Sequence, residues 1–365
     1  MKDWWLYQGA GEAAERRARL EVGPPPPWRD FKGVPDPGYT PPGCEGPAWE
    51  RTWRRGEGYV PDELEKDVVN TALHLRRPLL ITGKPGVGKS TLASSIAADL
   101  GLGPVLHWPV TSRTVLRDGL YLYDAIGRLQ EAGLEQLRTP GAPPHAAAAG
   151  APGPTGAAQA PSGAADGGPS IARYLRLGPL GTALLPQDRP RVLLVDEIDK
   201  SDIDLPGDLL TVFEDGGFVI PELARLVKEA PTVAIGTDDE DTEEVVRISQ
   251  GRVQCRYFPI VVLTSNGERD FPPAFLRRCV RLHLDPPGPD KLARIVRGRL
   301  GVDIENSDEY RDLVRSFLER AEDGDLATDQ LLNAIQLRLA GAWSAPGDRE
   351  RFLATVMHHL TGPSA

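Results

Sequence analysis

Eight consecutive residues constrain the fold of this chain more than any other segment. Residues 83–90 read Gly-Lys-Pro-Gly-Val-Gly-Lys-Ser, which fits the pattern G-x-x-x-x-G-K-[ST] at every fixed position. The apolar run before them, residues 78–82, predicts a buried strand, and residues 91–98 predict a helix. A strand, a glycine loop and a helix in this order point backbone N–H groups and the helix dipole at a phosphate. The alternative is a Gly-rich turn that fits the pattern by accident.

This loop predicts a nucleotide site with Mg²⁺. We expect Lys89 to place its charge on the outer phosphates and the Ser90 hydroxyl to hold the metal ion. The residues expected to bind the nucleotide are Gly83, Lys84, Pro85, Gly86, Val87, Gly88, Lys89, Ser90 and Thr91.

A second apolar run ends in two carboxylates about a hundred residues later. Residues 192–195 are Val-Leu-Leu-Val, and Asp196 and Glu197 follow them. A central strand of a parallel sheet is apolar throughout, so its first polar residues emerge at the carboxyl end, where the loop also lies. We expect Asp196 to hold Mg²⁺ and Glu197 to polarise an attacking water. An acidic strand end alone is weak evidence, but together with the loop it favours hydrolysis.

A third predicted strand, residues 258–265, ends at Asn266. From a neighbouring strand, Asn266 would reach the γ-phosphate and the attacking water. Its alternative role is a turn-forming Asn before Gly267, since this dipeptide is common in loops.

A basic segment follows at residues 271–279. Arg277 and Arg278 end a short predicted helix, and residues 280–284 alternate like a strand. A solvated basic turn is one interpretation. The other is an arginine finger, which stabilises charge on a neighbouring subunit's nucleotide.

The order of these parts resembles that of an AAA+ ATPase, and more narrowly the MoxR branch of the helix-2-insert group. The resemblance extends from residue 59 to the C-terminus. The segments that carry it are GKPGVGKST, LLVDEIDKSDIDLPGDLLTVFEDGGFVIPEL, VVLTSN and FPPAFLRRC.

The resemblance implies a ring-forming ATPase, hexameric in the family, that remodels or activates protein partners, often with a partner that carries a von Willebrand A domain. It implies ATP and Mg²⁺ as cofactors. The roles that it implies are Walker A for Lys89 and Ser90, Walker B for Asp196 and Glu197, sensor 1 for Asn266, and arginine finger for Arg278 first and Arg277 second.

One position departs from the family pattern. Residues 326–332 align with the sensor 2 helix, but Asp329 or Gln330 stands where the family has Arg. Arg338 lies two turns further along that helix. Sensor 2 therefore stays unassigned.

The predicted fold class is α/β: a P-loop AAA+ core with a parallel sheet between helices, at residues 59–288, and a small all-α lid at residues 289–365. Residues 1–58 form an arm rich in Pro and Trp, which we expect to dock on its own core or on a neighbouring subunit. Residues 139–170 are almost wholly small and polar, so we expect disorder there. This insertion is either a tolerated expansion or a partner-binding tether.

A second polar element lies at residues 245–256. Alternating runs around Gln250-Gly251 predict a hairpin. Its arginines, Arg247, Arg252 and Arg256, would either grip DNA in a pore or act as charges that protect an edge strand from aggregation.

Composition narrows the function classes. A net charge of −10 argues against broad nucleic-acid binding. The three cysteines show no metal-binding spacing, and no apolar run approaches a membrane span or a signal peptide, so the cytoplasm is expected.

Three functions remain open: a ring ATPase that remodels proteins, a nucleotide-gated switch with slow hydrolysis, and a DNA translocase. A GTPase is disfavoured. Residues 199–202, Asp-Lys-Ser-Asp, resemble the guanine-reading N-K-x-D but lack its Asn.

Overall fold

The computed structural model describes residues 2–9, 24–138, 170–240, 245–304, 307–323, 326–341 and 355–357. The predicted disorder of residues 139–170 falls, apart from residue 170, outside this part of the chain.

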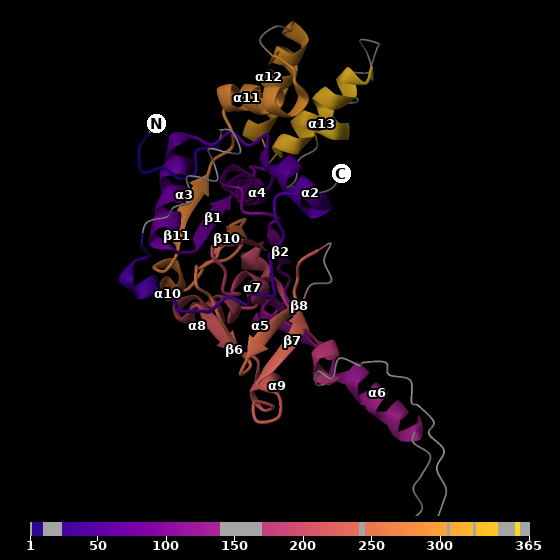
Figure 1. Cartoon of the computed structure of the whole chain (residues 1–365). Helices are drawn as coiled ribbons and strands as arrows, with labels where there is room; N and C mark the ends of the chain where they lie inside the picture. The colour runs from indigo at the N-terminus through magenta and orange to yellow at the C-terminus, as the bar shows by residue number, and fades with distance from the viewer. Residues whose placement is uncertain are drawn as a thin grey trace, which may run out of the picture.

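A five-stranded sheet forms the centre of the molecule (Figure 1). All of its strand pairs are parallel. In spatial order the strands are β11 (Val280–Leu284), β1 (Leu79–Gly83), β10 (Ile260–Ser265), β5 (Val192–Asp196) and β2 (Leu106–Pro109).

Both faces of this sheet are buried at its centre, because alternate residues of β1, β10 and β5 face two separate hydrophobic clusters. Leu79 and Ile81 pack with helices α3 (Glu63–Leu75) and α4 (Lys89–Leu100). Leu80 packs in the other cluster, with α7 (Pro179–Ala183) and α8 (Leu205–Asp215). A parallel sheet requires cover on both faces, which explains why its central strands β1, β10 and β5 are apolar over most of their length. The predicted α/β architecture, a parallel sheet flanked by helices, is confirmed.

Two smaller sheets lie beyond the face of the central sheet that packs against α7 and α8 (Figure 1). One contains β3 (Tyr121–Tyr123), β4 (Leu175–Leu177), β7 (Thr232–Gly236) and β8 (Val245–Ser249), and the other contains β6 (Gly217–Val219) and β9 (Arg252–Gln254). The turn predicted at Gln250-Gly251 is present, and both residues have a positive φ. The predicted hairpin is wrong, however, because β8 pairs with β7 whereas β9 pairs with β6. Alternation along the sequence specifies strands but not their partners.

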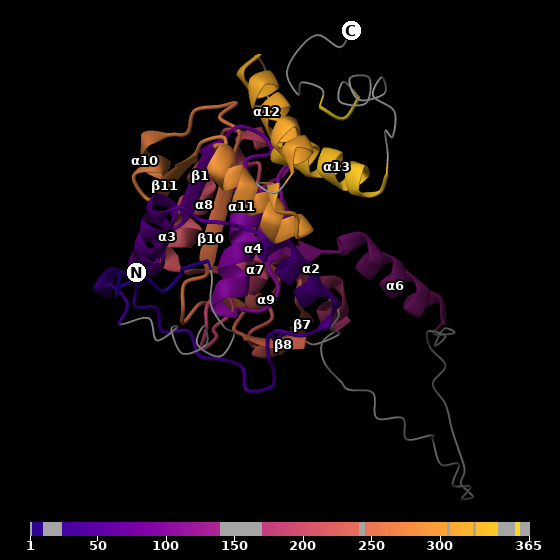
Figure 2. The same cartoon turned by 90° about the horizontal axis from the view of Figure 1, so that it is seen from above.

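Helix α6 (Ala125–Arg138) extends away from the body of the molecule in both views (Figures 1 and 2). Its first turns carry exposed apolar side chains, Ile126 and Leu129. The remaining short elements are η1 (Pro27–Arg29), α5 (Leu116–Leu120), η2 (Ser170–Tyr174), η3 (Ile198–Lys200), α9 (Pro221–Ala224) and α10 (Pro273–Leu276).

Three C-terminal helices have a hydrophobic core of their own. They are α11 (Pro289–Leu300), α12 (Asp308–Asp323) and α13 (Thr328–Leu339). Leu292, Phe317 and Leu331 lie in this core, one from each helix, and all three are almost fully buried. The helices lie together at one end of the molecule, beside α4 and α2 (Gly46–Gly56) (Figure 2).

The N-terminal arm docks on its own chain. Tyr7 is fully buried, and its hydroxyl lies 2.9 Å from Ser95 Oγ on α4. Further along, the N–H of Gly33 donates to the carbonyl of Cys255. Helix α2 then packs on α4 so closely that a Cβ at Gly56 would lie 2.5 Å from a backbone oxygen of α4. Of the two docking modes expected for the arm, the structure therefore contains the one on its own core.

Candidate functional site

The loop after β1 is held in a conformation that requires glycine. Gly83, Gly86 and Gly88 all have positive φ angles, of 151°, 76° and 99°. A Cβ on Gly86 would lie 2.1 Å from the Cβ of Ala327, just before α13, and one on Gly83 would lie 2.4 Å from the carbonyl oxygen of Leu284. The glycines thus serve both the turn and the close approach of two other segments.

Lys89 opens helix α4 and donates to three oxygen atoms of the chain. Its Nζ lies 2.8 Å from the carbonyl oxygen of Gly83, 2.9 Å from that of Lys84 and 2.7 Å from Asn266 Oδ1. Burial lowers the pKa of Lys89, and nearby carboxylates, Asp199 foremost, act in the opposite direction. The structure therefore brings together the predicted Walker A lysine and the predicted sensor 1 residue.

Ser90 and Asp196 also meet, as the sequence predicts. Ser90 Oγ donates to Asp196 Oδ1 at 2.7 Å, and Thr264 Oγ1 on β10 donates to the same oxygen at 2.6 Å. His107 Nε2, on β2, lies 3.4 Å from the other oxygen, Oδ2. Burial alone would raise the pKa of Asp196, but the hydrogen bonds from these three partners outweigh it and hold the pKa at about 2. Asp196 is therefore an ionised carboxylate at neutral pH.

This donor set fits Mg²⁺. A hydroxyl and an ionised carboxylate are hard oxygen ligands, and Mg²⁺ characteristically takes one or two carboxylates plus phosphate oxygens and water. In the part of the chain that the structure describes, no cluster of three or more His, Cys, Asp or Glu residues offers an all-protein metal cage. Ser90 and Asp196 would hold the ion together with the phosphates.

Glu197 adopts a left-handed conformation with φ 60° and ψ 48°. Its backbone N–H donates to Thr264 Oγ1 at 2.9 Å, and its carboxylate oxygen Oε2 lies 2.8 Å from Lys200 Nζ. Left-handed backbone is strained for a residue other than Gly, and such strain concentrates at functional sites. The side chain is partly exposed at the carboxyl edge of the sheet, beside Asp196.

The two candidate finger arginines differ in their surroundings. Arg278 forms an ion pair with Glu214 on α8, and its Nη1 donates to the carbonyl of Ala274. This guanidinium holds the pKa of Glu214 below its usual value. Arg277 is exposed, and its side chain makes no hydrogen bond or ion pair with any described residue. Its backbone carbonyl accepts a hydrogen bond from Arg77. Neither side chain forms a hydrogen bond or an ion pair with the described loop at residues 83–90, the P-loop.

A cavity of about 300 Å³ lies between the P-loop and the C-terminal helices. This size suits a small-molecule ligand. Of the two residues considered for the sensor 2 position, Asp329 lines the cavity, whereas Gln330 is buried and its Oε1 accepts from the N–H of Ala327. The cavity's lining residues include Tyr59, Val60, Gly86, Thr91, Ile295, Arg299 and Leu332.

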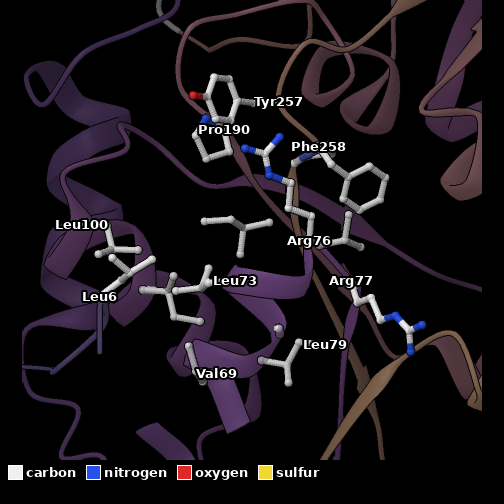
Figure 3. A pocket seen from close by; sticks show the side chains of 15 residues that line it. Leu6, Val69, Leu73, Arg76, Arg77, Leu79, Leu100, Pro190, Tyr257 and Phe258 are labelled. Carbon is white, nitrogen blue, oxygen red and sulfur yellow. The ribbon is translucent and has the colours of Figure 1, made fainter. Parts of the chain in front are cut away.

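A second, mostly apolar cavity lies at the opposite end of the sheet strands. Figure 3 shows Leu73, Leu79 and Phe258 around it, with the side chains of Arg76 and Arg77 beside them. The Arg76 guanidinium stacks on the ring of Tyr257 at 4.5 Å. Because Leu79 begins β1 and the P-loop follows the end of β1, this cavity is separate from the P-loop site.

The arginines expected to line a pore are engaged within the chain. Arg247 donates to Asp36 of the arm at 2.7 Å, and Arg256 donates to Asp188 at 2.7 Å. Arg252 is also exposed, but it forms no ion pair with a described residue.

Sequence reasoning did not single out Thr264, His107 or Asp199 as parts of the site. Thr264 stands inside an apolar run, and His107 belongs to a short strand of alternating burial. The signal that was available is position for two of them, since Thr264 lies at the carboxyl end of β10 and Asp199 lies just after that of β5.

No model of a known protein family matches the chain, and no curated protein matches it either. The three cysteines, Cys44, Cys255 and Cys279, are free thiols, as expected. Within the described residues, no helix has the length and apolar character needed to cross a membrane.

Proposed function

We propose that the chain is an ATP-hydrolysing AAA+ ATPase of the MoxR type. The observation that carries this proposal is the convergence of two pairs at one sheet edge. Lys89 lies 2.7 Å from Asn266, and Ser90 lies 2.7 Å from Asp196. A phosphate-binding lysine, a metal-binding pair and a polar group on the adjacent strand are the parts that phosphoryl transfer requires.

The residues have distinct roles in this proposal. The P-loop N–H groups and Lys89 bind the phosphates, and Ser90 with Asp196 orients Mg²⁺. Bound Mg²⁺ supplies positive charge that offsets the charge developing on the phosphates. Glu197 accepts a proton from the attacking water, and Asn266 holds that water in line. The cavity beside Gly86 takes the rest of the nucleotide.

The same proposal covers assembly. Residues 59–288 form the ATPase core and residues 289–365 a lid, and the chain assembles into a homo-oligomeric ring, hexameric as in the family. The partner is a protein, and by analogy with the family it carries a von Willebrand A domain. Arg277 is the better candidate for the finger, because Arg278 is occupied by Glu214 whereas Arg277 is exposed. This reverses the order expected from the sequence.

Phosphate release from ATP by the purified protein tests the proposal. Lys89→Ala should abolish nucleotide binding, and Glu197→Gln should keep binding but lose turnover. Lys32→Ala, which removes an exposed lysine of the arm, is the matched control and should change neither. ATP binding and turnover that are unaffected by Lys89→Ala would refute the proposed site.

A nucleotide-gated switch is the second candidate. It is favoured by the predicted sensor 2 position, where Asp329 or Gln330 stands, because neither side chain supplies a positive charge to stabilise the phosphates. A turnover far below one per minute, with tight ATP binding, would support the switch. The translocase loses support, since Arg247 and Arg256 already have acidic partners in the chain. Stimulation of hydrolysis by DNA would restore it.

A further inference from the structure

The short helix η3 after β5 contains a buried carboxylate that the proposed roles do not use. Asp199 belongs to the segment 199–202, which resembles a guanine-reading motif, and only 3% of the residue is exposed. A charged group is almost never buried unless it is paired or hydrogen-bonded. Its partners therefore indicate its role.

Those partners are backbone groups of the loop that follows β10. Asp199 Oδ2 accepts from the N–H of Asn266 at 2.8 Å and from the N–H of Glu268 at 3.2 Å. Hydrogen bonds to an ionised acceptor are about twice as strong as neutral ones. Gly267, between the two donors, has a φ of 80°, so the chain turns around this carboxylate.

The carboxylate therefore fixes the point from which the Asn266 side chain extends. That side chain accepts from Lys89 Nζ at 2.7 Å. The contacts form a continuous path from the acidic strand end at β5, through Asp199 and Asn266, to the P-loop lysine. A group held this way retains its position when nucleotide replaces one of the lysine's partners.

We propose that Asp199 is a positioning residue that fixes Asn266 for hydrolysis by binding the backbone of its loop. This inference rests on the proposed function, since Asn266 acts only if ATP is hydrolysed. Asp199 needs an acceptor oxygen for this role, and the two N–H groups need no negative charge. An amide oxygen at the same place satisfies both.

Two substitutions separate geometry from charge. Asp199→Asn keeps one acceptor oxygen, so kcat should stay within about 3-fold of wild type. Asp199→Ala removes the acceptor, so kcat should fall by about 10- to 100-fold while the ATP dissociation constant changes by less than about 3-fold. Asp204→Ala is the matched control. It removes an exposed aspartate at the next helix start and should leave both quantities unchanged.

A double-mutant cycle with Asn266→Ala adds a second criterion. If Asp199 acts through Asn266, the double variant should be no slower than the slower single variant. Full additivity of the two losses would overturn the inference, as would full turnover in Asp199→Ala. An Asp199→Asn variant as slow as Asp199→Ala would overturn it too, because charge rather than geometry would then be required.

Hydrogen exchange at the amides of Asn266 and Glu268 measures the positioning directly, without nucleotide. Both amides should be protected in wild type and in Asp199→Asn, and should exchange at least about 10-fold faster in Asp199→Ala. Unchanged protection in Asp199→Ala refutes the inference even if the wild type hydrolyses ATP. Absent hydrolysis in the wild type refutes the proposed function instead, while the exchange still decides whether Asp199 holds the loop.

Discussion

Asn70 on α3 holds the first residues of the arm, and its replacement by Ala tests how firmly. The side chain is fully buried. Its Oδ1 accepts from the N–H groups of Leu6 (2.6 Å) and Tyr7 (2.8 Å), and its Nδ2 donates to the carbonyls of Tyr7 (2.8 Å) and Lys66 (2.8 Å). The carbonyl of Lys66 lies on α3 itself, so it is not counted among the groups of the arm. The substitution therefore leaves three backbone groups of the arm without their partner.

The expected cost follows from these three groups. A buried polar group without a partner costs about 1–3 kcal/mol, and the partly buried N–H of Leu6 lies at the low end, so the sum is about 3–7 kcal/mol if the arm stays docked. In the variant, the arm can instead dissociate from the core. Detachment limits the loss to the free energy of docking, in which burial of Tyr7 contributes about 2–3 kcal/mol. We therefore expect a loss of about 3 kcal/mol, together with release of the arm.

Urea unfolding followed by circular dichroism measures the first quantity, and hydrogen exchange at residues 2–9 measures the second. Thr71→Ala is the matched control. Thr71 is the next residue on α3, and its Oγ1 donates only to the carbonyl of Asp67 in the same helix, so we expect a change below about 0.5 kcal/mol. A loss below about 1 kcal/mol in Asn70→Ala, with residues 2–9 still protected from exchange, would refute the reasoning.

Four further outcomes are expected. Glu197→Gln should keep ATP affinity while turnover falls by about 100-fold or more, measured by phosphate release and nucleotide titration. Arg277→Ala should lower turnover by about 100-fold or more, and it should inactivate neighbouring sites when it is mixed with wild type. Arg278→Ala should chiefly lower the midpoint of thermal unfolding. The reverse pattern would return the finger role to Arg278. Asp238→Asn should stabilise the protein at pH 7 but not below about pH 4. Burial raises the pKa of Asp238 to about 6, above its unfolded value, so the native carboxyl loses stability as pH rises through this window, and equal urea midpoints at pH 7 would contradict this. Replacing residues 139–169 by a short Gly-Ser linker should leave solubility and turnover intact, and insoluble protein would show that the segment is structural.

The strands and their chemistry were accessible from the sequence because each rests on local information. Runs of apolar residues predicted β1, β5 and β10, and the polar residues after them predicted which side chains meet. The distances of 2.7 Å at Ser90 and Lys89 agree with that interpretation. Chain order did not specify that β10 lies between β1 and β5. That order is a property of tertiary packing.

The contacts that the sequence did not reveal are those between distant segments. Arg278 and Glu214 are 64 residues apart, and no local pattern connects them. Asp199 was noticed only for its resemblance to a guanine-reading motif, because its loop partners lie on another strand. The aromatic content of the arm predicted docking, but it did not identify Tyr7 as the anchor or Asn70 as its partner.

The path of the arm has a consequence for the synthesis of the protein. The arm leaves the ribosome before the core, yet its partners come much later: Asn70 and Ser95 for residues 2–9, and the Cys255 carbonyl for Gly33. The aromatic side chains of residues 2–9 therefore lack their partners while much of the core is translated, and transiently exposed apolar surface of this kind favours aggregation or chaperone binding. Docking of the arm is therefore a late step of folding, because Gly33 can bind its partner only after the segment that contains Cys255 has been synthesised.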